Sequence, residues 1–180
     1  MIFVTVGTQL PFDRLVRTVD GWCSTNERQE VFGQIARPGS DGYVPTNFEW
    51  QMFLDPEEFR ERFSQATIVI AHAGMGSIIS ALSIGKPIVI MPRMASLGEH
   101  RNDHQAGTAR RFATRAGIFV AHDESSLGTA ADAALKAVAV SGDGSRPEPD
   151  PRLIRCISDF IFSDTLRAHR RGSAQGSGGV

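Results

Sequence analysis

Short apolar runs that alternate with amphipathic segments constrain the fold of this chain more than any other feature. The clearest apolar runs span residues 2–6, 68–71, 88–91 and 118–121. Their nearly continuous apolar character is typical of strands that are buried on both faces, as in parallel sheets. The alternation predicts an α/β fold with a doubly wound parallel sheet, Rossmann-like, and a ligand outside the carboxyl ends of the strands.

Capping and periodicity place the remaining elements. A helix with one apolar stripe is predicted from Pro11. Asp55 is suited to cap the next helix, to about Ser64, and Glu58 stands where a capping box places its acid. Further helices are predicted for residues 77–85, 103–115 and 124–138. Further strands are predicted for residues 29–35 and 47–53.

The composition indicates one soluble domain over residues 1–140. A Gly- and Pro-rich connector at 141–151, a C-terminal helix at 152–171 and a flexible tail at 172–180 are expected to follow. The net charge of −1 gives no basic field for nucleic acid. Cys23 and Cys156 lie far apart and predict reduced thiols. No apolar run approaches the ~20 residues of a membrane helix, and the apolar N-terminus is too short for a signal peptide.

The strongest local motif is His72-Ala73-Gly74-Met75-Gly76-Ser77, directly after a predicted strand. Its two glycines let backbone N–H groups approach a phosphate, and Ser77 is expected to open a helix whose N-terminus favours an anion. Two plainer interpretations stay open at this point: the glycines only permit a tight turn, and His72 is a structural histidine. The motif lacks the spacing of a dinucleotide fingerprint and the lysine of a Walker loop.

Three loops converge on one edge of the predicted sheet. They are Gly7-Thr8-Gln9, His72–Ser77 and Pro92–Gln105. The first two offer glycines, a hydroxyl and a helix N-terminus, which together are able to bind a diphosphate without a metal ion. In the third loop, His104 and Gln105 carry donors and acceptors suited to sugar hydroxyls. His100 and His104 have the spacing of metal ligands but lack an evident third ligand, so no metal is expected.

These residues, in this order, resemble the donor-binding half of GT-B glycosyltransferases, in particular the family 28 C-terminal domain. The resemblance extends to the small catalytic subunits of two-chain N-acetylglucosaminyltransferases and to bacterial one-domain subunits of exopolysaccharide and capsule synthesis. It covers roughly residues 1–140. The motifs that carry it are Phe3–Thr8, His72–Ser77, Gly85–Pro87 and Gly98–Gln105.

The resemblance implies a UDP-sugar as donor substrate and no cofactor. The residues it assigns to the diphosphate are His72, Gly74, Gly76 and Ser77, aided by Gly7 and Thr8. Those it assigns to the sugar are Asp103, His104 and Gln105. Many relatives hold the ribose with a glutamate where this chain has Ser80, so either ribose binding is rebuilt, with Glu99 as a substitute, or the nucleotide is held less tightly.

The resemblance also implies a second subunit, because GT-B enzymes bind the acceptor on another domain. We expect a membrane-anchored partner that binds a lipid-linked saccharide acceptor, and hence a cytoplasmic location peripheral to the inner face of the membrane. The helix at 152–171 either docks on that partner or packs on its own domain. In the implied reaction an acceptor hydroxyl attacks the anomeric carbon, and His72 stabilises the leaving diphosphate.

The sequence leaves open which residue is the general base, and it allows functions other than sugar transfer. Glu99 and Asp13 are the acidic residues near the proposed edge, and the partner is the other source of the base. A non-catalytic module that binds a donor and regulates another transferase is the alternative function, favoured by Ser80. An epimerase similar to the UDP-N-acetylglucosamine 2-epimerases needs two joined domains, which the length disfavours.

Overall fold

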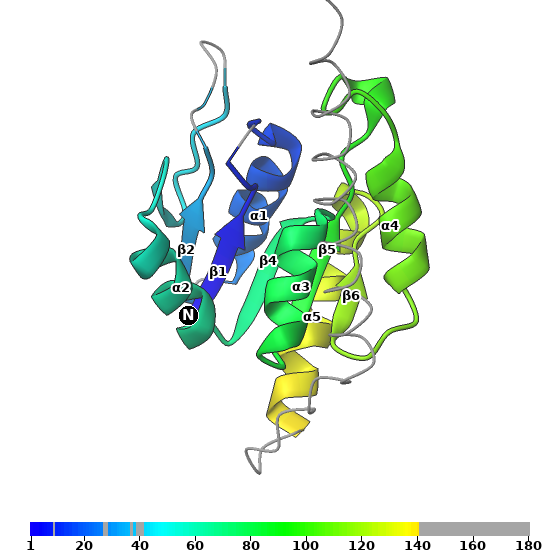
Figure 1. Cartoon of the computed structure of the whole chain (residues 1–180). Helices are drawn as coiled ribbons and strands as arrows, with labels where there is room; N and C mark the ends of the chain where they lie inside the picture. Colours follow the sequence, from blue (N-terminus) through cyan, green and yellow to red (C-terminus); the bar gives the residue numbers. More distant parts are fainter. Residues whose placement is uncertain (9, 27–28, 37, 39–41, 141–180) are drawn as a thin grey trace, which may run out of the picture. The chain divides into compact units, whose positions relative to one another are not determined.

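A six-stranded, fully parallel sheet forms the centre of the domain (Figure 1). The structure is a computed structural model that describes residues 1–8, 10–26, 29–36, 38 and 42–140. The strands are β1 (Ile2–Thr5), β2 (Val31–Gln34), β3 (Glu49–Gln51), β4 (Ile68–His72), β5 (Ile88–Met91) and β6 (Ile118–Val120). Their order in the sheet is β3-β2-β1-β4-β5-β6, so the chain reverses its winding between β1 and β4. Such a switch point is where doubly wound sheets bind their ligands.

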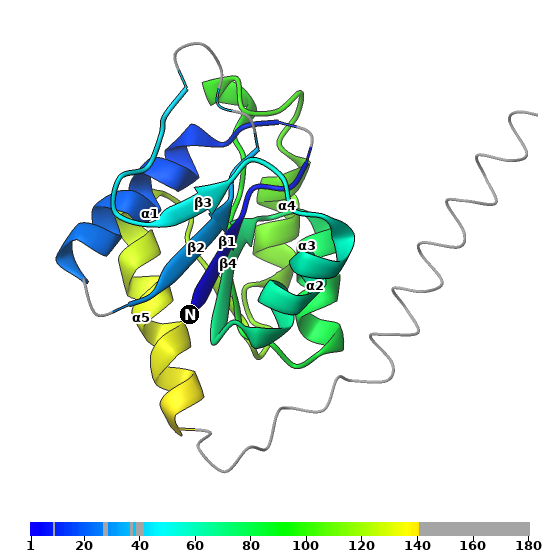
Figure 2. The same cartoon turned by 90° about the vertical axis from the view of Figure 1, so that its left-hand side faces the viewer.

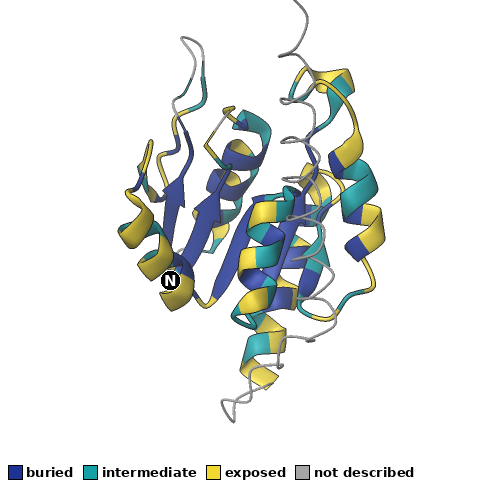
Figure 3. Cartoon of the chain, viewed as in Figure 1, coloured by how far each residue is buried: buried dark blue, intermediate teal, exposed yellow. Residues whose placement is uncertain are grey.

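Helices cover both faces of the sheet (Figures 1 and 2). They are α1 (Asp13–Thr25), α2 (Pro56–Gln65), α3 (Met75–Ser83), α4 (His104–Phe112) and α5 (Glu124–Val140), with a short 3-10 turn η1 (Ala95–Leu97). Helices α1 and α5 pack on one face, where Leu15 and Leu127 are fully buried. Helices α2, α3 and α4 pack on the other, around Phe3, Phe63 and Ile78. Figure 3 shows the buried strands between the two half-exposed helical layers.

The predicted α/β class and all six predicted strands are confirmed, whereas several helix ends differ. Helix α1 begins at Asp13 rather than Pro11, because the backbone of Phe12 is not helical (φ −141°, ψ 68°) and its ring is buried in the core. Helix α3 begins at Met75, so Ser77 is its third residue rather than its first. Parallel strands are located well by their apolar runs, but a helix start depends on tertiary contacts of the first turn.

The N-cap that the sequence predicted for α2 is confirmed, but the predicted capping box is wrong. Oδ1 of Asp55 accepts hydrogen bonds from the N–H groups of Glu57 and Glu58, both at 2.9 Å. The carboxylate of Glu58 turns instead to Arg62, one turn later, at 2.9 Å. An ion pair at i, i+4 therefore replaces the reciprocal bond of the box.

The predictions for residues 141–151, 152–171 and 172–180, and for Cys156, lie outside the described residues. Within the described part, Cys23 is a free, buried thiol, and burial raises its pKa to about 11. None of the helices in that part is both long enough and apolar enough to cross a membrane.

Candidate donor-binding site

A cavity of about 920 Å³ opens at the carboxyl edge of the sheet, around the switch point. The loops after β1, β3, β4 and β5 line it. Eight of the ten residues predicted for the site are among its lining residues: Gly7, Thr8, His72, Gly74, Gly76, Ser77, His104 and Gln105. Glu99 and Asp103 are not. The three loops that the sequence predicted to converge therefore do meet.

His72 sits at the end of β4 with its imidazole between two glycines. A Cβ atom built on Gly7 would lie 2.9 Å from Cε1 of His72, and one built on Gly74 would lie 2.8 Å from Cδ2 and closer still to Nε2. Real Cβ atoms do not approach other atoms this closely, so both glycines are needed for the ring to occupy this place. Gly7 also has φ +81°, a conformation that favours glycine. The glycine motif thus makes room for His72 as well as for a turn.

The surroundings of His72 keep its ring neutral. Burial is the main cause that lowers the pKa of His72 to about 4, and the charge of nearby Arg93 and the proximity of His100 act in the same direction. The backbone of Thr5 acts in the opposite direction and raises the pKa, although Nδ1 of His72 is buried with no hydrogen-bond partner among the described residues. A neutral imidazole has one N–H donor and one acceptor. At neutral pH His72 is therefore a dipolar donor rather than a cation.

Helix α3 points its N-terminus into the same cavity. Gly74 is the N-cap residue in an extended conformation (φ −86°, ψ 138°), and no side chain caps the first turn. A Cβ atom added at Gly76 would meet nothing within 4 Å. The first N–H groups of α3 are thus left to a ligand or to water, and the helix dipole favours an anion there.

The loop after β5 supplies the polar residues on the other side of His72. Gln105 is buried, and its Oε1 accepts from the N–H of Arg93 at 3.1 Å. His104 is exposed, and its ring stands edge-on to that of His100, with centroids 4.6 Å apart. Asp103, which we predicted to contact the sugar, accepts from the N–H of Ala95 at 2.8 Å and holds η1 in place. His104 and Gln105 thus face the cavity, and Asp103 shapes the loop.

Glu99 and Asp13, the acidic residues that the sequence offered as a base, do not line the cavity. Both carboxylate oxygens of Glu99 are hydrogen-bonded to Arg14, at 2.7 and 2.9 Å. Oδ2 of Asp13 accepts from the N–H of Tyr43 at 3.2 Å. The catalytic role predicted for Glu99 stays a prediction, but the structure gives its carboxylate a partner that competes with such a role.

Arg93 is a residue of the site that the sequence reasoning missed. It is buried, lines the cavity and donates to the carbonyls of Val6 (3.0 Å), Leu10 (2.7 Å) and Pro11 (2.6 Å). These carbonyls belong to the loop after β1, so Arg93 ties that loop to the loop after β5. The signal available in the sequence was a charged residue directly after a buried strand.

The far end of the cavity is apolar and aromatic, which the sequence reasoning also missed. Phe53, Leu54 and Phe59 line it, together with Arg60. Phe53 is 63% exposed, which is unusual for a large apolar side chain. Among the described lining residues, the charged and titratable ones are Arg60, Arg93 and three histidines, and none is a carboxylate. The described residues also contain no cluster of metal-ligating side chains.

The doubly wound parallel sheet of this chain is a fold that it shares with a solved glycosyltransferase structure. Residues 1–127 match the glycosyltransferase family 28 C-terminal domain, and the chain belongs to that family.

The chain is similar to the human UDP-N-acetylglucosamine transferase subunit ALG13, with 32% identity over 126 residues, which cover 66% of this chain and 11% of the relative. It is also similar to the subunit of the same name in Yarrowia lipolytica, with 28% identity over 138 residues, 71% of this chain and 68% of the relative. The chain spans about a tenth of the length of its mammalian relatives.

Solved structures share the fold. The glycotransferase of kitacinnamycin superposes with a TM-score of 0.59 and 22% identity, over 86% of this chain and 39% of that one. The solution structure of ALG13 gives a TM-score of 0.51 and 21% identity, over 83% of this chain and 88% of that one. The second comparison covers most of both chains, so this fold also occurs in a chain that is little longer than the matched part.

Proposed function

We propose that this chain is the donor-binding, catalytic subunit of a UDP-sugar-dependent glycosyltransferase. The observation that carries the proposal is the place of the His72 ring in the cavity wall, between Gly7 and Gly74 and beside the uncapped N-terminus of α3. N–H donors and a helix dipole converge there on one point of the cavity. Such a site suits the diphosphate of a nucleotide-sugar, and it stabilises the charge that develops when UDP leaves.

The order of the strands supports a layout for the whole donor. The loop after β3 offers Phe53 as a stacking surface for the base. The loops after β1 and β4 lie beyond β2 along the sheet edge and hold the diphosphate, with Gly7, Thr8, Gly76 and Ser77 around His72. The loop after β5 follows, and His104 and Gln105 contact the sugar. The ligand thus runs from β3 to β5 across the switch point.

In the proposed reaction an acceptor hydroxyl attacks the anomeric carbon, the bond to the diphosphate breaks and UDP leaves. The acceptor loses its proton to a base. Because no carboxylate is found among the described residues that line the cavity, we propose that the partner subunit supplies this base. The similarity to transferase subunits supports a two-chain enzyme.

The partner in this proposal is a membrane-anchored subunit that binds a lipid-linked saccharide, in exopolysaccharide or capsule synthesis. This chain would then be cytoplasmic and peripheral to the inner face of the membrane. Cell fractionation with and without the partner tests this part: the chain should move to the membrane fraction only when the partner is present.

Calorimetry with UDP, UDP-glucose, UDP-glucuronate and UDP-N-acetylglucosamine tests the donor site. We expect UDP to bind, and His72→Ala to weaken binding by about tenfold or more, the size of one lost charge-assisted hydrogen bond. His122→Ala is the matched control, because His122 is exposed and does not line the cavity. Absence of UDP binding, or equal binding by both variants, would contradict the site.

A second candidate is a non-catalytic donor-binding module that regulates another transferase. The absence of a carboxylate among the described lining residues, with Ser80 in the wall of the cavity, favours it. Sugar transfer in the presence of the membrane partner separates the two functions. Transfer that His72→Ala abolishes supports the catalytic subunit, whereas transfer that His72→Ala leaves unchanged supports the module.

A further inference from the structure

Glu99 accepts hydrogen bonds from two arginines, Arg14 of α1 and Arg93 of its own loop. Its carboxylate accepts two hydrogen bonds from Arg14 of α1, from Nε at 2.7 Å and from Nη2 at 2.9 Å. Its backbone carbonyl accepts from Nη1 of Arg93 at 3.5 Å. Glu99 also accepts from the N–H of Met94 at 2.8 Å, which closes its own loop. The position of residue 99 is therefore fixed by side chain and main chain together.

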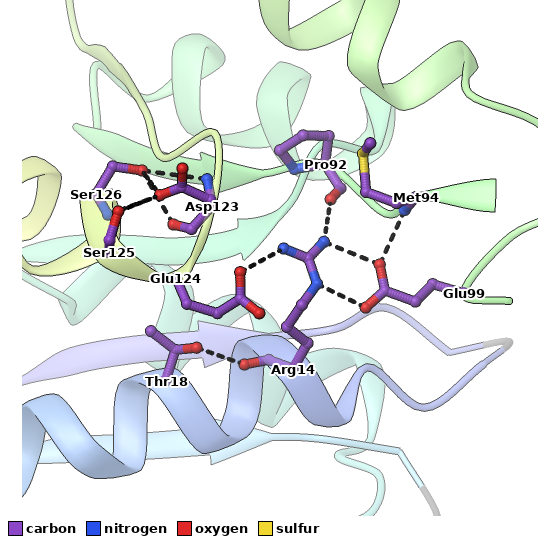
Figure 4. A network of polar contacts seen from close by, with 9 residues as sticks. All are labelled: Arg14, Thr18, Pro92, Met94, Glu99, Asp123, Glu124, Ser125 and Ser126. Carbon is purple, nitrogen blue, oxygen red and sulfur yellow. Dashed lines mark hydrogen bonds and ion pairs between the residues drawn. The ribbon is translucent and has the colours of Figure 1, made fainter. Parts of the chain in front are cut away.

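The pair of Arg14 with Glu99 is a planar, two-bond contact that is largely shielded from water (Figure 4). The two side chains are 11% and 12% exposed. Arg14 also donates to the carbonyl of Pro92 at 2.8 Å and reaches Glu124 of α5 at 3.3 Å. The hydrogen bond with Glu99 is the main cause that raises the pKa of Arg14. A lysine has no fork of donors and cannot reproduce this contact.

The next residue, His100, lines the cavity. Its ring packs edge-on against His104, and its Nδ1 is buried with no hydrogen-bond partner among the described residues. A buried polar atom without a partner is uncommon in a native protein. His100 therefore places an imidazole in the wall of the cavity, and the described chain leaves one of its nitrogens without a partner.

We propose that the Arg14–Glu99 pair fixes His100 in the cavity wall, and that His100 thereby determines how tightly the site holds the sugar of the donor. In this scheme His100 contacts the sugar and Arg14 is a positioning residue that acts through it. The inference rests on the proposed function, because it needs a donor whose diphosphate lies at His72.

The place of His100 in the fold explains why the sugar, and not the nucleotide, should be affected. The loop after β5 lies on the opposite side of His72 from the loop after β3, where the aromatic residues line the cavity. We expect a shift of residues 99–100 to change the contacts at the sugar end of the ligand more than those at the diphosphate and the base. UDP and a UDP-sugar therefore report on different parts of the cavity.

The first test compares the dissociation constants of UDP and of the tightest-binding UDP-sugar of the panel. For Arg14→Met we expect the Kd of the UDP-sugar to rise about tenfold and that of UDP to change by less than about twofold. Arg14→Lys should recover only part of the loss. The matched control is Arg17→Met on the same helix, because Arg17 stacks on Tyr43 and has no contact with Glu99. Equal weakening of both ligands would overturn the proposal.

A double-mutant cycle tests whether Arg14 acts through His100. His100→Ala alone should weaken binding of the UDP-sugar about as much as Arg14→Met does. The double variant should lose no more affinity than the single variant with the larger effect. Effects that add fully would mean that Arg14 acts elsewhere, and the proposal would be wrong.

Proton NMR of the ligand-free chain gives a readout that needs no ligand. The ring signals of His100 should shift in Arg14→Met and stay in place in Arg17→Met; unchanged signals in Arg14→Met would overturn the positioning role. A chain that binds no nucleotide at all would overturn the proposed function, and the sugar-selecting role of His100 with it. A chain that binds UDP but shows no selective loss in Arg14→Met would overturn the present inference alone.

Discussion

The imidazole of His72 occupies the space that a side chain at Gly74 would need. A Cβ atom at Gly74 would lie 2.8 Å from Cδ2 of His72, well inside ordinary contact distance. The second glycine of the motif is different, because a Cβ atom at Gly76 would meet nothing within 4 Å. The two glycines therefore have different tasks: Gly74 admits the ring of His72, and Gly76 leaves the helix N-terminus open.

This difference predicts different outcomes for two alanine substitutions. Gly74→Ala should displace His72 and lower the free energy of unfolding by about 1–3 kcal/mol. It should also raise the dissociation constant of UDP about tenfold or more. Gly76→Ala should leave the free energy of unfolding within about 0.5 kcal/mol of the parent value, or raise it. Its effect should be confined to weaker binding of UDP. Urea unfolding and calorimetry measure the two effects. Gly107→Ala in α4, which also meets nothing within 4 Å, is the control for both. Strong destabilisation by Gly76→Ala would contradict this division of tasks.

The low pKa of His72 predicts a pH-dependent stability. The folded pKa is about 4, below the usual 6.5, so the unfolded chain binds more protons between these values. The stabilising contribution of neutral His72 is fully present above about pH 6.5 and is lost as the pH falls toward 4, by an amount of about 2–3 kcal/mol.

Urea unfolding of the parent chain and of His72→Gln, at pH 7 and at pH 4.5, measures this contribution. The fall in stability between the two pH values should be smaller in the variant, because glutamine does not titrate. Equal falls would mean that His72 has an ordinary pKa. NMR titration of the ring gives the same answer directly. UDP should raise the pKa of His72, since a diphosphate favours the charged ring.

Asp20 of α1 lies outside the cavity lining, and its removal is expected to destabilise the fold strongly. It is buried, and its carboxylate accepts from the hydroxyl of Tyr43 at 2.7 Å and from the N–H groups of Thr46 and Asn47 at 3.0 and 2.7 Å. Burial acts to raise the pKa of Asp20, but these hydrogen bonds outweigh it and hold the pKa below its usual range. Asp20 thus holds the segment that leads into β3.

Asp20→Ala should lower the free energy of unfolding by about 3 kcal/mol, because it leaves several donors without a partner. Asp132→Ala, at an exposed position of α5, should have little effect. The contribution of Asp20 is present above its unfolded pKa, near 4, and is lost as the pH falls through the lower folded value. A variant as stable as the parent would show that water replaces these bonds at little cost.

Donor binding is expected to be independent of divalent metal ions. Mg²⁺ in proteins prefers oxygen ligands, above all carboxylates, and no carboxylate is found among the described residues that line the cavity. In the proposed site the N–H groups around His72 and the dipole of α3 are expected to take the place of a cation. Calorimetry with UDP in EDTA and in excess Mg²⁺ should give dissociation constants within about threefold of each other. A tenfold or larger loss in EDTA would refute this expectation.

The sequence by itself determined the sheet and the position of the glycine–histidine loop. Apolar runs bounded by glycine and proline locate parallel strands well, because such strands are buried on both faces and need no information from distant residues. Once the strands are placed, topology brings the loops after β1, β4 and β5 to one edge. Gly7, Gly74, Gly76 and His72 therefore line the cavity as their sequence positions predicted.

Only the tertiary structure decided which polar residues face that cavity and which serve the scaffold. Glu99 was predicted at the ligand, and that role stays a prediction; in the structure both its carboxylate oxygens are hydrogen-bonded to Arg14, 85 residues away in sequence. The sequence reasoning singled out neither Arg93 nor Asp20 for the part it plays, yet each holds a loop by several hydrogen bonds to backbone groups. Local periodicity reports which face of an element is buried. It carries no information on the partner of a charged side chain, because that partner is set by the packing of segments distant in sequence.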